Sequence, residues 1–593
     1  MGVMSRPALA LASAGGVVAF LGLAILGWGG FDAFFANSAR VALVVATVVM
    51  VVAGLFSSAN LSTGEREDRS NRWIIGALGL VGLLSAPLAT AQQTPYPWPT
   101  RGWPTSSPEE QGMSSERLAR LVDFGAFNYM DSVLVTRHGR IVLEATYAPF
   151  RAGLRHRFYS ATKSVTSTLV GMALADGRLD STDHKVVDFF ADRTIANLDD
   201  AKKAITVQHL LDMTSGLAWQ EGVNGGAESY IAMTRSPDWQ QFILDQPMTT
   251  PPGSRFYYNT GNSHLLSAIL GKVTGRSTLD YARARLFGPL GIDDVLWRVD
   301  PQGVSNGGND LYLQPRDMAK IGYLWLRGGL WEGKQILPAA WIEGVRSADV
   351  DMHESWSADI RYGRQFWVMP RRDTFMAVGY HRQLVVVMPG LDIVAVATGS
   401  SRFASASGLP STPRYGLDAL AGFLAAAVTS DDAVAANPAA TAELAERVKA
   451  AALEQPAPAS PAGPPALVKA VSGKTWRFTG SPARLKSLTL KLDDPQPSYE
   501  YELDLGPPMV PPGPFGGPIG FDGHFRVGGR TLVGLSAARG AWSADGTSLV
   551  LEVQTLGGDD VARVTLVFGD RTVELSADYA GGFRLKLQGR TDD

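Results

Sequence analysis

The sequence predicts a multidomain chain with three N-terminal transmembrane helices, an α/β domain built on an antiparallel sheet, and a C-terminal all-β domain. Three observations predict this fold class. At 593 residues the chain exceeds the ~250–300 residues at which a single hydrophobic core stops growing. Its N-terminal region holds three long apolar stretches, and an Ala/Pro-rich segment separates two regions of different patterning. We therefore expect a membrane region at 1–92, an α/β domain at 93–430, a linker at 431–466 and a β domain at 467–593.

The N-terminal region is predicted to cross a membrane three times. Its apolar stretches run from Ala8 to Trp28, from Ala42 to Phe56 (extending to Ala59) and from Trp73 to Ala91, and each approaches the ~20 residues that a membrane-spanning helix needs. Arginines lie before the first stretch and cluster between the second and third. By the positive-inside rule the N-terminus is then cytoplasmic, and everything after Ala91 lies on the periplasmic or extracellular side. The alternative is a signal segment cleaved after Ala91.

The region at 93–430 is predicted to place helices on one antiparallel sheet. Two short strands flank a His138-Gly139 turn, and a late pair of strands occupies 384–388 and 393–397. Helical spacing fills the middle, for example at 207–213 and 262–273. Strands at both ends of the region, with helices between them, favour a single sheet that both ends complete.

The C-terminal region is predicted to be all-β. Short alternating runs, such as 487–492, 548–553 and 563–568, recur between Gly, Asp and Pro turns. The proline run that precedes them is expected to be extended and semi-rigid, although 442–453 favours a helix. The β domain contains no cluster of residues suited to catalysis, so we expect a structural or lid-like role for it.

Composition excludes several kinds of chemistry. The chain has no cysteine, which removes disulfides, thiolate catalysis and cysteine-based metal sites. A formal net charge of -3 gives no basic footprint for nucleic acid. The eight histidines include no His-Glu-x-x-His pair, so a zinc hydrolase is poorly supported. The serine chemistry considered below is expected to need neither a metal nor another cofactor.

The most informative motif is Ser160-Ala-Thr-Lys163. Residues 161–175 show helical spacing closed by Gly177, so Ser160 is expected to begin a buried helix, where unpaired backbone N–H groups favour developing negative charge. Residues at i and i+3 share a helix face, so Lys163 can reach the serine hydroxyl. The alternative is a helix-capping serine beside a solvated lysine.

A second segment supplies further polar groups. A lysine acts as a base only if its pKa falls well below the ordinary ~10.4, which burial achieves. Tyr257 offers a second proton carrier, and Asn259 can donate to a substrate carbonyl and accept from an amide. A serine, an amine and a phenol together favour acyl transfer, with an ester or amide as substrate.

Three segments carry a resemblance to a known family. They are 158–167 around the Ser-x-x-Lys motif, 205–217 with its Leu-Leu-Asp-Met-Thr-Ser-Gly-Leu sequence, and 252–261 with its Tyr-Tyr-Asn-Thr-Gly sequence. These segments resemble the motifs of the serine hydrolases related to penicillin-binding proteins and class C β-lactamases, in particular the esterase and 6-aminohexanoate-dimer hydrolase branch. The resemblance runs from about Pro104 to Leu424 and implies a β-lactamase/transpeptidase-like fold for the α/β domain.

The resemblance also implies roles for individual residues. Ser160 is then the nucleophile, Lys163 its activating base and Tyr257 the proton relay to the leaving group. An oxyanion hole needs two donors, each worth ~3 kcal/mol. The backbone N–H of Ser160 is implied as one of them, and we predict that of Ala377, on the edge strand, as the other.

The third motif of the family is altered in this sequence. Its position resembles Thr374-Phe-Met, where no cation stands. In β-lactamases and peptidoglycan DD-peptidases that cation helps to hold the substrate carboxylate, so its absence counts against both activities. His381 and Arg382 occupy a stretch where similar hydrolases often have two glycines. We predict that they line the cleft and that Arg382 replaces the missing cation; the alternative is a salt-bridged surface arginine. Trp219 and Trp367 are expected as apolar pocket walls.

The sequence therefore predicts a membrane-anchored, outward-facing serine hydrolase of the esterase or amidase type. Its expected partner is a small-molecule ester or amide substrate, and no binding of nucleic acid is expected. Two alternatives stay open: a D-amino acid peptidase or β-lactamase-like enzyme, and a non-catalytic ligand-binding sensor on the same fold. The complete set of Ser160, Lys163 and Tyr257 argues against the sensor, because a binding module needs no base.

Overall fold

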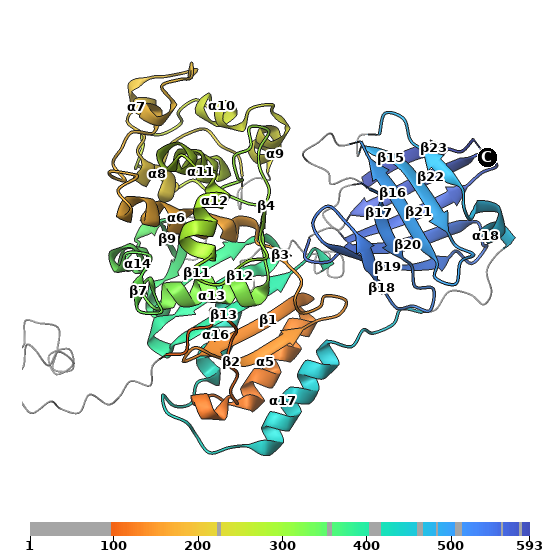
Figure 1. Ribbon diagram of the computed structural model, residues 1–593, viewed down its shortest axis with the longest axis horizontal. Helices are drawn as coiled ribbons and strands as arrows, with labels where there is room; N and C mark the ends of the chain where they lie inside the picture. Colours follow the sequence, from red (N-terminus) through yellow and green to blue (C-terminus); the bar gives the residue numbers. More distant parts are fainter. Residues whose placement is uncertain are drawn as a thin grey trace, which may run out of the picture. The chain divides into compact units, whose positions relative to one another are not determined.

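Two antiparallel sheets, one of eight strands and one of ten, form the framework of the chain (Figure 1). The computed structural model describes residues 96–592 with eight internal gaps. These gaps are 222–226, 353–358, 403–416, 459–465, 482–483, 505–512, 559–560 and 580–583. Residues Pro97–Asp593 form one compact unit that contains both sheets.

The eight-stranded sheet is completed by segments from both ends of the α/β domain. Its strand order is β2-β1-β13-β12-β11-β10-β9-β8. The strands are β1 (Met130–Arg137), β2 (Arg140–Thr146), β8 (Val350–Asp351), β9 (Arg361–Gly363), β10 (Phe366–Met369), β11 (Thr374–Gly379), β12 (Gln383–Met388) and β13 (Ile393–Gly399). Val133 of β1 lies opposite Ala397 of β13. The predicted single sheet and both predicted strand pairs are confirmed.

The central strands are apolar at nearly every position because both faces of the sheet are covered. In β12, Val385 and Val387 pack into one hydrophobic core, whereas Leu384 and Val386 pack into the core on the opposite face. Successive side chains of a strand point to opposite faces, so a strand buried on both sides reads as a continuous apolar run.

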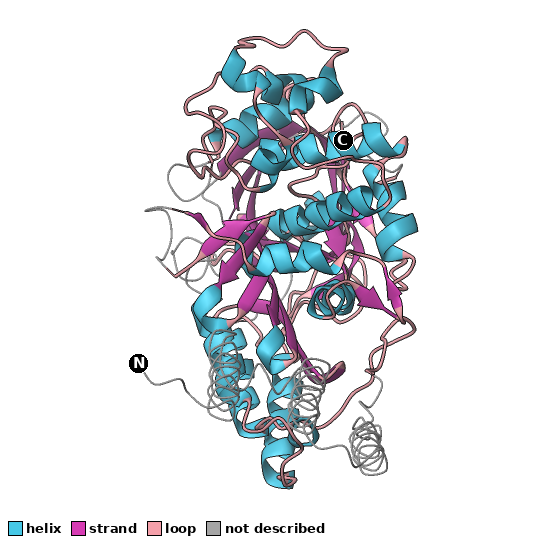
Figure 2. Ribbon diagram, turned by 90° about the vertical axis from the view of Figure 1, so that its left-hand side faces the viewer, coloured by secondary structure: helices cyan, strands magenta, loops and turns pink. Residues whose placement is uncertain are grey.

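Helices supply the other side of each core, and Figure 2 shows helices and strands in separate colours. One core includes residues of α6, α11 and α13, and the other includes residues of α5, α16 and α17. The helices of the domain are α5 (Ser115–Phe127), α6 (Thr162–Ala175), α7 (Asp200–Lys203), α8 (Val207–Leu211), α9 (Glu228–Arg235), α10 (Trp239–Leu244), α11 (Thr260–Thr274), α12 (Thr278–Ala282), α13 (Pro315–Leu326), α14 (Ala339–Arg346), α16 (Leu417–Ala427) and α17 (Pro438–Ala451). The helices predicted at 207–213 and 262–273 correspond to α8 and α11.

Helix α17 lies within the segment predicted as a linker. Its Leu444 is buried in the core beneath the sheet, and its Arg447 forms an ion pair with Asp123 of α5, 2.6 Å between nitrogen and oxygen. Asn437 caps the helix by accepting from the backbone N–H of Ala440. This part of the segment therefore packs as a helix of the α/β domain.

The C-terminal domain is a barrel-like arrangement of ten strands, β17-β16-β15-β14-β23-β22-β21-β20-β19-β18. Its elements are α18 (Ala466–Val471), β14 (Thr475–Arg477), β15 (Leu485–Lys491), β16 (Ser498–Leu503), β17 (Phe515–Pro518), β18 (Arg526–Arg530), β19 (Leu535–Trp542), β20 (Ser548–Thr555), β21 (Val561–Phe568), β22 (Thr572–Tyr579) and β23 (Arg584–Arg590). The two strands that end the order, β17 and β18, lie against each other. Inward-facing residues such as Trp476, Leu490, Leu549 and Leu566 form one core.

The membrane part of the predicted fold class, and with it the multi-pass location, is not supported. Within the residues that the structure describes, no helix is long and apolar enough to cross a membrane. Helix α11, with 15 residues, falls short of the ~20 that a bilayer requires. The three apolar stretches on which that prediction rested lie outside the described residues. The fold class is thus corrected to an α/β domain followed by a barrel-like β domain.

Candidate active site

Ser160 lies where a short turn leads into a buried helix. Residues Tyr159–Ala161 form a 3-10 turn, and α6 follows directly from Thr162. Strand β3 (His156–Arg157), which pairs with β5 (Leu311–Leu313), fixes the chain on the other side of the turn. Ser160 itself is half-buried, so its hydroxyl stands at the boundary between the core and the exterior.

Lys163 points its amine at Ser160. The Nζ atom lies 3.1 Å from Ser160 Oγ, 2.9 Å from Thr260 Oγ1 and 2.8 Å from the carbonyl oxygen of Gly308. The side chain is almost fully buried, and this burial lowers the lysine pKa to about 8, while the Glu221 carboxylate acts in the opposite direction. The amine is therefore much closer to losing its proton at neutral pH than a solvated lysine.

Tyr258, rather than Tyr257, stands beside the serine. The Tyr258 hydroxyl forms a hydrogen bond with Ser160, and its ring centroid lies 4.9 Å from Lys163 Nζ. Burial raises the pKa of this phenol above its ordinary value, so the hydroxyl keeps its proton. Tyr257 instead packs against the core that contains α6 and α11. Successive side chains of an extended segment face opposite sides, so a shift of one residue exchanges the two tyrosines.

Asn259 has a structural position at the start of α11. Its side-chain oxygen accepts from the backbone N–H of Asn262 at 3.2 Å, which is the usual geometry of a helix N-cap. The amide nitrogen of the side chain is buried and has no partner among the described residues. The substrate contact predicted for Asn259 stays a prediction.

Besides Tyr258, two further residues of the site were not predicted from the sequence. Thr260 accepts from Lys163 and donates to Glu221, 2.5 Å between the two oxygens, and its backbone N–H donates to the other oxygen of the same carboxylate at 2.8 Å. Glu221 also accepts from Trp219 Nε1 at 2.6 Å. Thr260 could have been found by reading the motif from Tyr258, two residues before it. Glu221 lies 39 residues from Thr260, and no local pattern connects them.

Strand β11, which lies between β12 and β10 in the sheet rather than at its edge as predicted, closely approaches the serine turn at Gly379. A Cβ atom on Gly379 would lie 2.4 Å from the carbonyl oxygen of Phe158, so only glycine fits here without movement. Strand β10 pairs with β11 only over Thr374–Met376, and no described strand covers Ala377–Gly379 on that side. Ala377 thus lies in the part of β11 that does not pair with β10, near the turn. Its role as an oxyanion donor stays a prediction.

His381 and Arg382 follow the end of β11 and are both buried. The His381 ring centroid lies 5.5 Å from that of Tyr159, the residue before Ser160. Arg382 donates to the backbone carbonyl of Asn128 at 3.4 Å, so it is not a surface arginine. Burial lowers the pKa of its guanidinium. A contact of either residue with substrate remains a prediction.

The predicted pocket walls lie on different parts of the site. Trp219 is buried in the core on the α6 side, where it holds Glu221. Trp367 belongs to the core on the other face of the sheet, and its ring centroid lies 6.2 Å from that of Tyr258. Trp219 thus contacts Glu221, and Trp367 lies near Tyr258.

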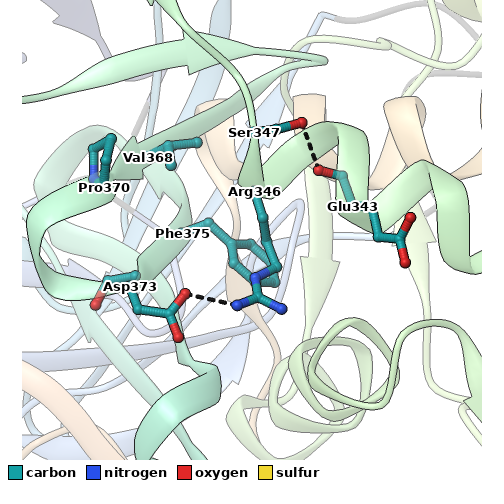
Figure 3. A pocket seen from close by; sticks show the side chains of 8 residues that line it. Glu343, Arg346, Ser347, Val368, Pro370, Asp373 and Phe375 are labelled. Carbon is teal, nitrogen blue, oxygen red and sulfur yellow. Dashed lines mark hydrogen bonds and ion pairs between the residues drawn. The ribbon is translucent and has the colours of Figure 1, made fainter. Parts of the chain in front are cut away.

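A separate depression of about 330 Å³ lies between α14 and strands β10 and β11 (Figure 3). Arg346 and Asp373 form an ion pair of 2.9 Å across it, and the ring of Phe375 contributes to its wall. None of the predicted site residues lines this depression. The reactive groups therefore lie elsewhere, around Ser160.

The side chains around Ser160 are hydroxyl, amine and carboxylate groups without a metal-binding arrangement. Across the described part of the chain, no group of three or more histidine, aspartate or glutamate side chains is placed to hold a metal ion. The arrangement of Ser160, Lys163 and Tyr258 can activate a hydroxyl, accept its proton and return a proton to another atom.

Comparison with known proteins agrees with the motifs. Residues 127–421 match the β-lactamase family. The chain is 26% identical over 288 residues to the 6-aminohexanoate-dimer hydrolase of Paenarthrobacter ureafaciens, an alignment that covers 46% of this chain and 72% of that protein. Among solved structures it resembles EstCE1, a hydrolase with promiscuous acyltransferase activity, at 18% identity and a TM-score of 0.43, over 53% of this chain and 99% of that one. It also resembles the octameric penicillin-binding protein homologue from Pyrococcus abyssi at 17% identity and a TM-score of 0.41, over 80% and 99% of the two chains.

Proposed function

Because this chain belongs to the β-lactamase/transpeptidase-like family and is a serine hydrolase of that family, we propose that it cleaves an ester or amide bond through an acyl-enzyme on Ser160. One observation supports the proposal above all others. The buried amine of Lys163 lies 3.1 Å from Ser160 Oγ, and burial lowers its pKa to about 8. A base in hydrogen-bond reach of a nucleophile, with its pKa near the working pH, is what nucleophilic catalysis requires.

In the proposed first step, neutral Lys163 accepts the hydroxyl proton of Ser160 while Oγ attacks the substrate carbonyl carbon. The carbonyl oxygen becomes an oxyanion, which the backbone N–H of Ser160 and a backbone N–H from residues 377–379 of β11 would stabilise. The bond to the leaving group then breaks, and Tyr258 gives its proton to the departing oxygen or nitrogen. Lys163 returns the proton to Tyr258. Water then cleaves the acyl-enzyme by the same steps in reverse order.

The substrate class is proposed to be a small ester or a linear amide rather than a β-lactam. The relative from Paenarthrobacter ureafaciens is a 6-aminohexanoate-dimer hydrolase, and a linear amide of that kind is a suitable first amide to test. Ser160, Lys163 and Tyr258 together provide the groups that acyl transfer needs, whereas β11 has no lysine at the position of the family's third motif, where Thr374 stands.

The acyl-enzyme can be observed directly. After acid quenching during turnover of p-nitrophenyl butyrate, the full-length chain should carry one butyryl group on the peptide that contains Ser160. Mass spectrometry of the intact chain and of its peptides measures this adduct, with a butyrate-treated sample as the control for non-covalent binding. A butyryl group on another residue, or turnover without any adduct under rapid quenching, would contradict the proposal.

The pH dependence follows from the lysine pKa. Lys163 must be neutral to act as a base, so kcat/KM for an uncharged ester should rise with pH and reach half of its plateau near pH 8. The measurement is the pH–rate profile, corrected for spontaneous ester hydrolysis. A half-maximum near ~6.5, the ordinary pKa of histidine, would point to a different base.

A further inference from the structure

Glu221 lies one hydroxyl group away from the amine of Lys163. The carboxylate accepts three hydrogen bonds: from Trp219 Nε1 at 2.6 Å, from the Thr260 backbone N–H at 2.8 Å and from the Thr260 hydroxyl at 2.5 Å. Trp219 and the backbone N–H both donate to Oε2, whereas the hydroxyl donates to Oε1. The two carboxylate oxygens are therefore held by different partners.

The direction of the Thr260 hydroxyl proton follows from this arrangement. A threonine hydroxyl has one hydrogen, and an ionised carboxylate can only accept. The hydrogen must lie toward Glu221, so the same oxygen faces Lys163 as an acceptor. The carbonyl of Gly308, 2.8 Å from Nζ, is likewise only an acceptor.

A neutral lysine in this position has two hydrogens and one lone pair. Thr260 and Gly308 take the two hydrogens, because neither has a hydrogen to give to the amine. The lone pair is then left for Ser160, whose hydroxyl can donate. Building on the function proposed above, we propose that Glu221 is a positioning residue that fixes the Thr260 hydroxyl as an acceptor and thereby aims the Lys163 lone pair at Ser160 Oγ.

The charge of Glu221 has a second, separable effect. The carboxylate favours the ammonium form of Lys163, so it raises the lysine pKa against the larger effect of burial. Tyr258 is the other titratable side chain at the amine. Strand β11, which packs on α6, contains no titratable residue, and Asp310, close to Gly308 in the chain, pairs with Arg157 at 2.7 Å. His264 on α11 pairs with Asp300 at 3.0 Å.

The test is Glu221→Gln. The oxygen of the glutamine amide must take the place of Oε2, since Trp219 and the backbone N–H can only donate there. Its NH₂ group then faces the Thr260 hydroxyl and donates to it, which turns the hydroxyl hydrogen toward Lys163. That hydrogen competes with Ser160 for the lone pair.

The readout is the rate at which an alkyl fluorophosphonate labels Ser160 of the full-length chain, followed by mass spectrometry from about pH 6 to about pH 10, a range that brackets the Lys163 pKa of about 8. Labelling needs an activated Ser160 but no turnover. For Glu221→Gln we expect the plateau rate to fall about 10- to 100-fold, as for the loss of a hydrogen bond to a charged group. The half-maximum should move to lower pH, because the negative charge that favoured the ammonium form is gone. In ester turnover, measured in parallel, kcat should fall while KM stays unchanged.

Glu109→Gln is the matched control. Glu109 accepts from the backbone N–H and the hydroxyl of Ser115, the first residue of α5, at 2.9 and 2.8 Å, just as Glu221 does at the first residue of α11. It has the same capping chemistry but does not contact the site, so its loss should alter thermal stability without moving the pH profile of labelling. Thr260→Val should reproduce the fall in rate, and Thr260→Ser, which keeps the hydroxyl, should restore it.

The outcomes separate this inference from the proposed function. Wild-type labelling that follows a lysine-like pH profile, with unchanged behaviour in Glu221→Gln and Thr260→Val, overturns the role of Glu221 alone. An effect confined to KM for cationic substrates also overturns it, because Glu221 would then contact the substrate. A chain that is labelled as expected but cleaves neither esters nor amides overturns the proposed function and leaves the positioning test valid. Absence of labelling in the wild type overturns both. If Glu221→Gln does not fold, the comparison of Thr260→Val with Thr260→Ser tests the inference instead.

Discussion

Ser160→Ala should lower kcat/KM for ester hydrolysis by about 10⁴-fold or more, and Lys163→Met should lower it by nearly as much. Removing the nucleophile leaves no atom to form the acyl-enzyme, and removing the amine leaves the hydroxyl without a base in reach. The two groups act as one unit because their side chains touch at 3.1 Å. The double variant should therefore be no slower than Ser160→Ala, a non-additivity that steady-state kinetics of all three variants measures.

Methionine is chosen at position 163 because it is unbranched and apolar and fits a buried position. Methionine also fills most of the volume of the lysine stem and so leaves little cavity, and thermal unfolding should show folded protein in every variant. Activity that survives Ser160→Ala at more than a trace level would place the nucleophile elsewhere. Activity that survives only Lys163→Met would mean that another group accepts the serine proton.

Tyr258→Phe should lower kcat/KM for an amide by about 10²- to 10³-fold, whereas Tyr257→Phe should leave it within about twofold of the wild type. The Tyr258 hydroxyl is hydrogen-bonded to Ser160, and burial raises its pKa, so it holds a proton that it can deliver to the leaving group. Tyr257 packs against the hydrophobic core that contains α6 and α11, so we expect its ring to matter and its hydroxyl to be dispensable. Phenylalanine preserves both rings, so the pair of variants isolates the two hydroxyl groups.

The size of the Tyr258→Phe effect should depend on the leaving group. An amine must be protonated to leave, whereas p-nitrophenolate leaves readily without a proton. The ratio of amide to ester activity should therefore fall in Tyr258→Phe and stay constant in Tyr257→Phe. Equal losses on both substrates would assign Tyr258 to activation of the serine instead. A loss confined to Tyr257→Phe would restore the tyrosine that the sequence motif first suggested.

The sequence was sufficient to predict elements that depend on local geometry. The spacing of Ser160 and Lys163 places them one helical turn apart in any α-helix, and α6 has that geometry. The hairpin at His138-Gly139 depends on a two-residue turn, and β1 and β2 meet there. The alternating runs after residue 467 predicted strands correctly, because a period of two is a property of the strand itself.

Other features depend on how the chain is oriented in space. A motif of two adjacent tyrosines does not show which ring turns toward the serine, since a one-residue shift exchanges the faces. The position of α17 against α5 depends on burial of Leu444 in a core that the rest of the domain provides. An Ala-rich sequence alone does not reveal such packing.

By itself the sequence determined the serine–lysine pair, the class of hydrolase and the succession of an α/β and an all-β region, because these follow from spacing, motif and period. The tertiary structure decided that Tyr258 joins the pair and that Glu221 reaches Lys163 through Thr260. Glu221 and Thr260 come from segments 39 residues apart. Their contact arises only when α11 packs against α6 and Glu221 reaches the first residue of α11, so the direction of the lysine lone pair is a property of the folded chain.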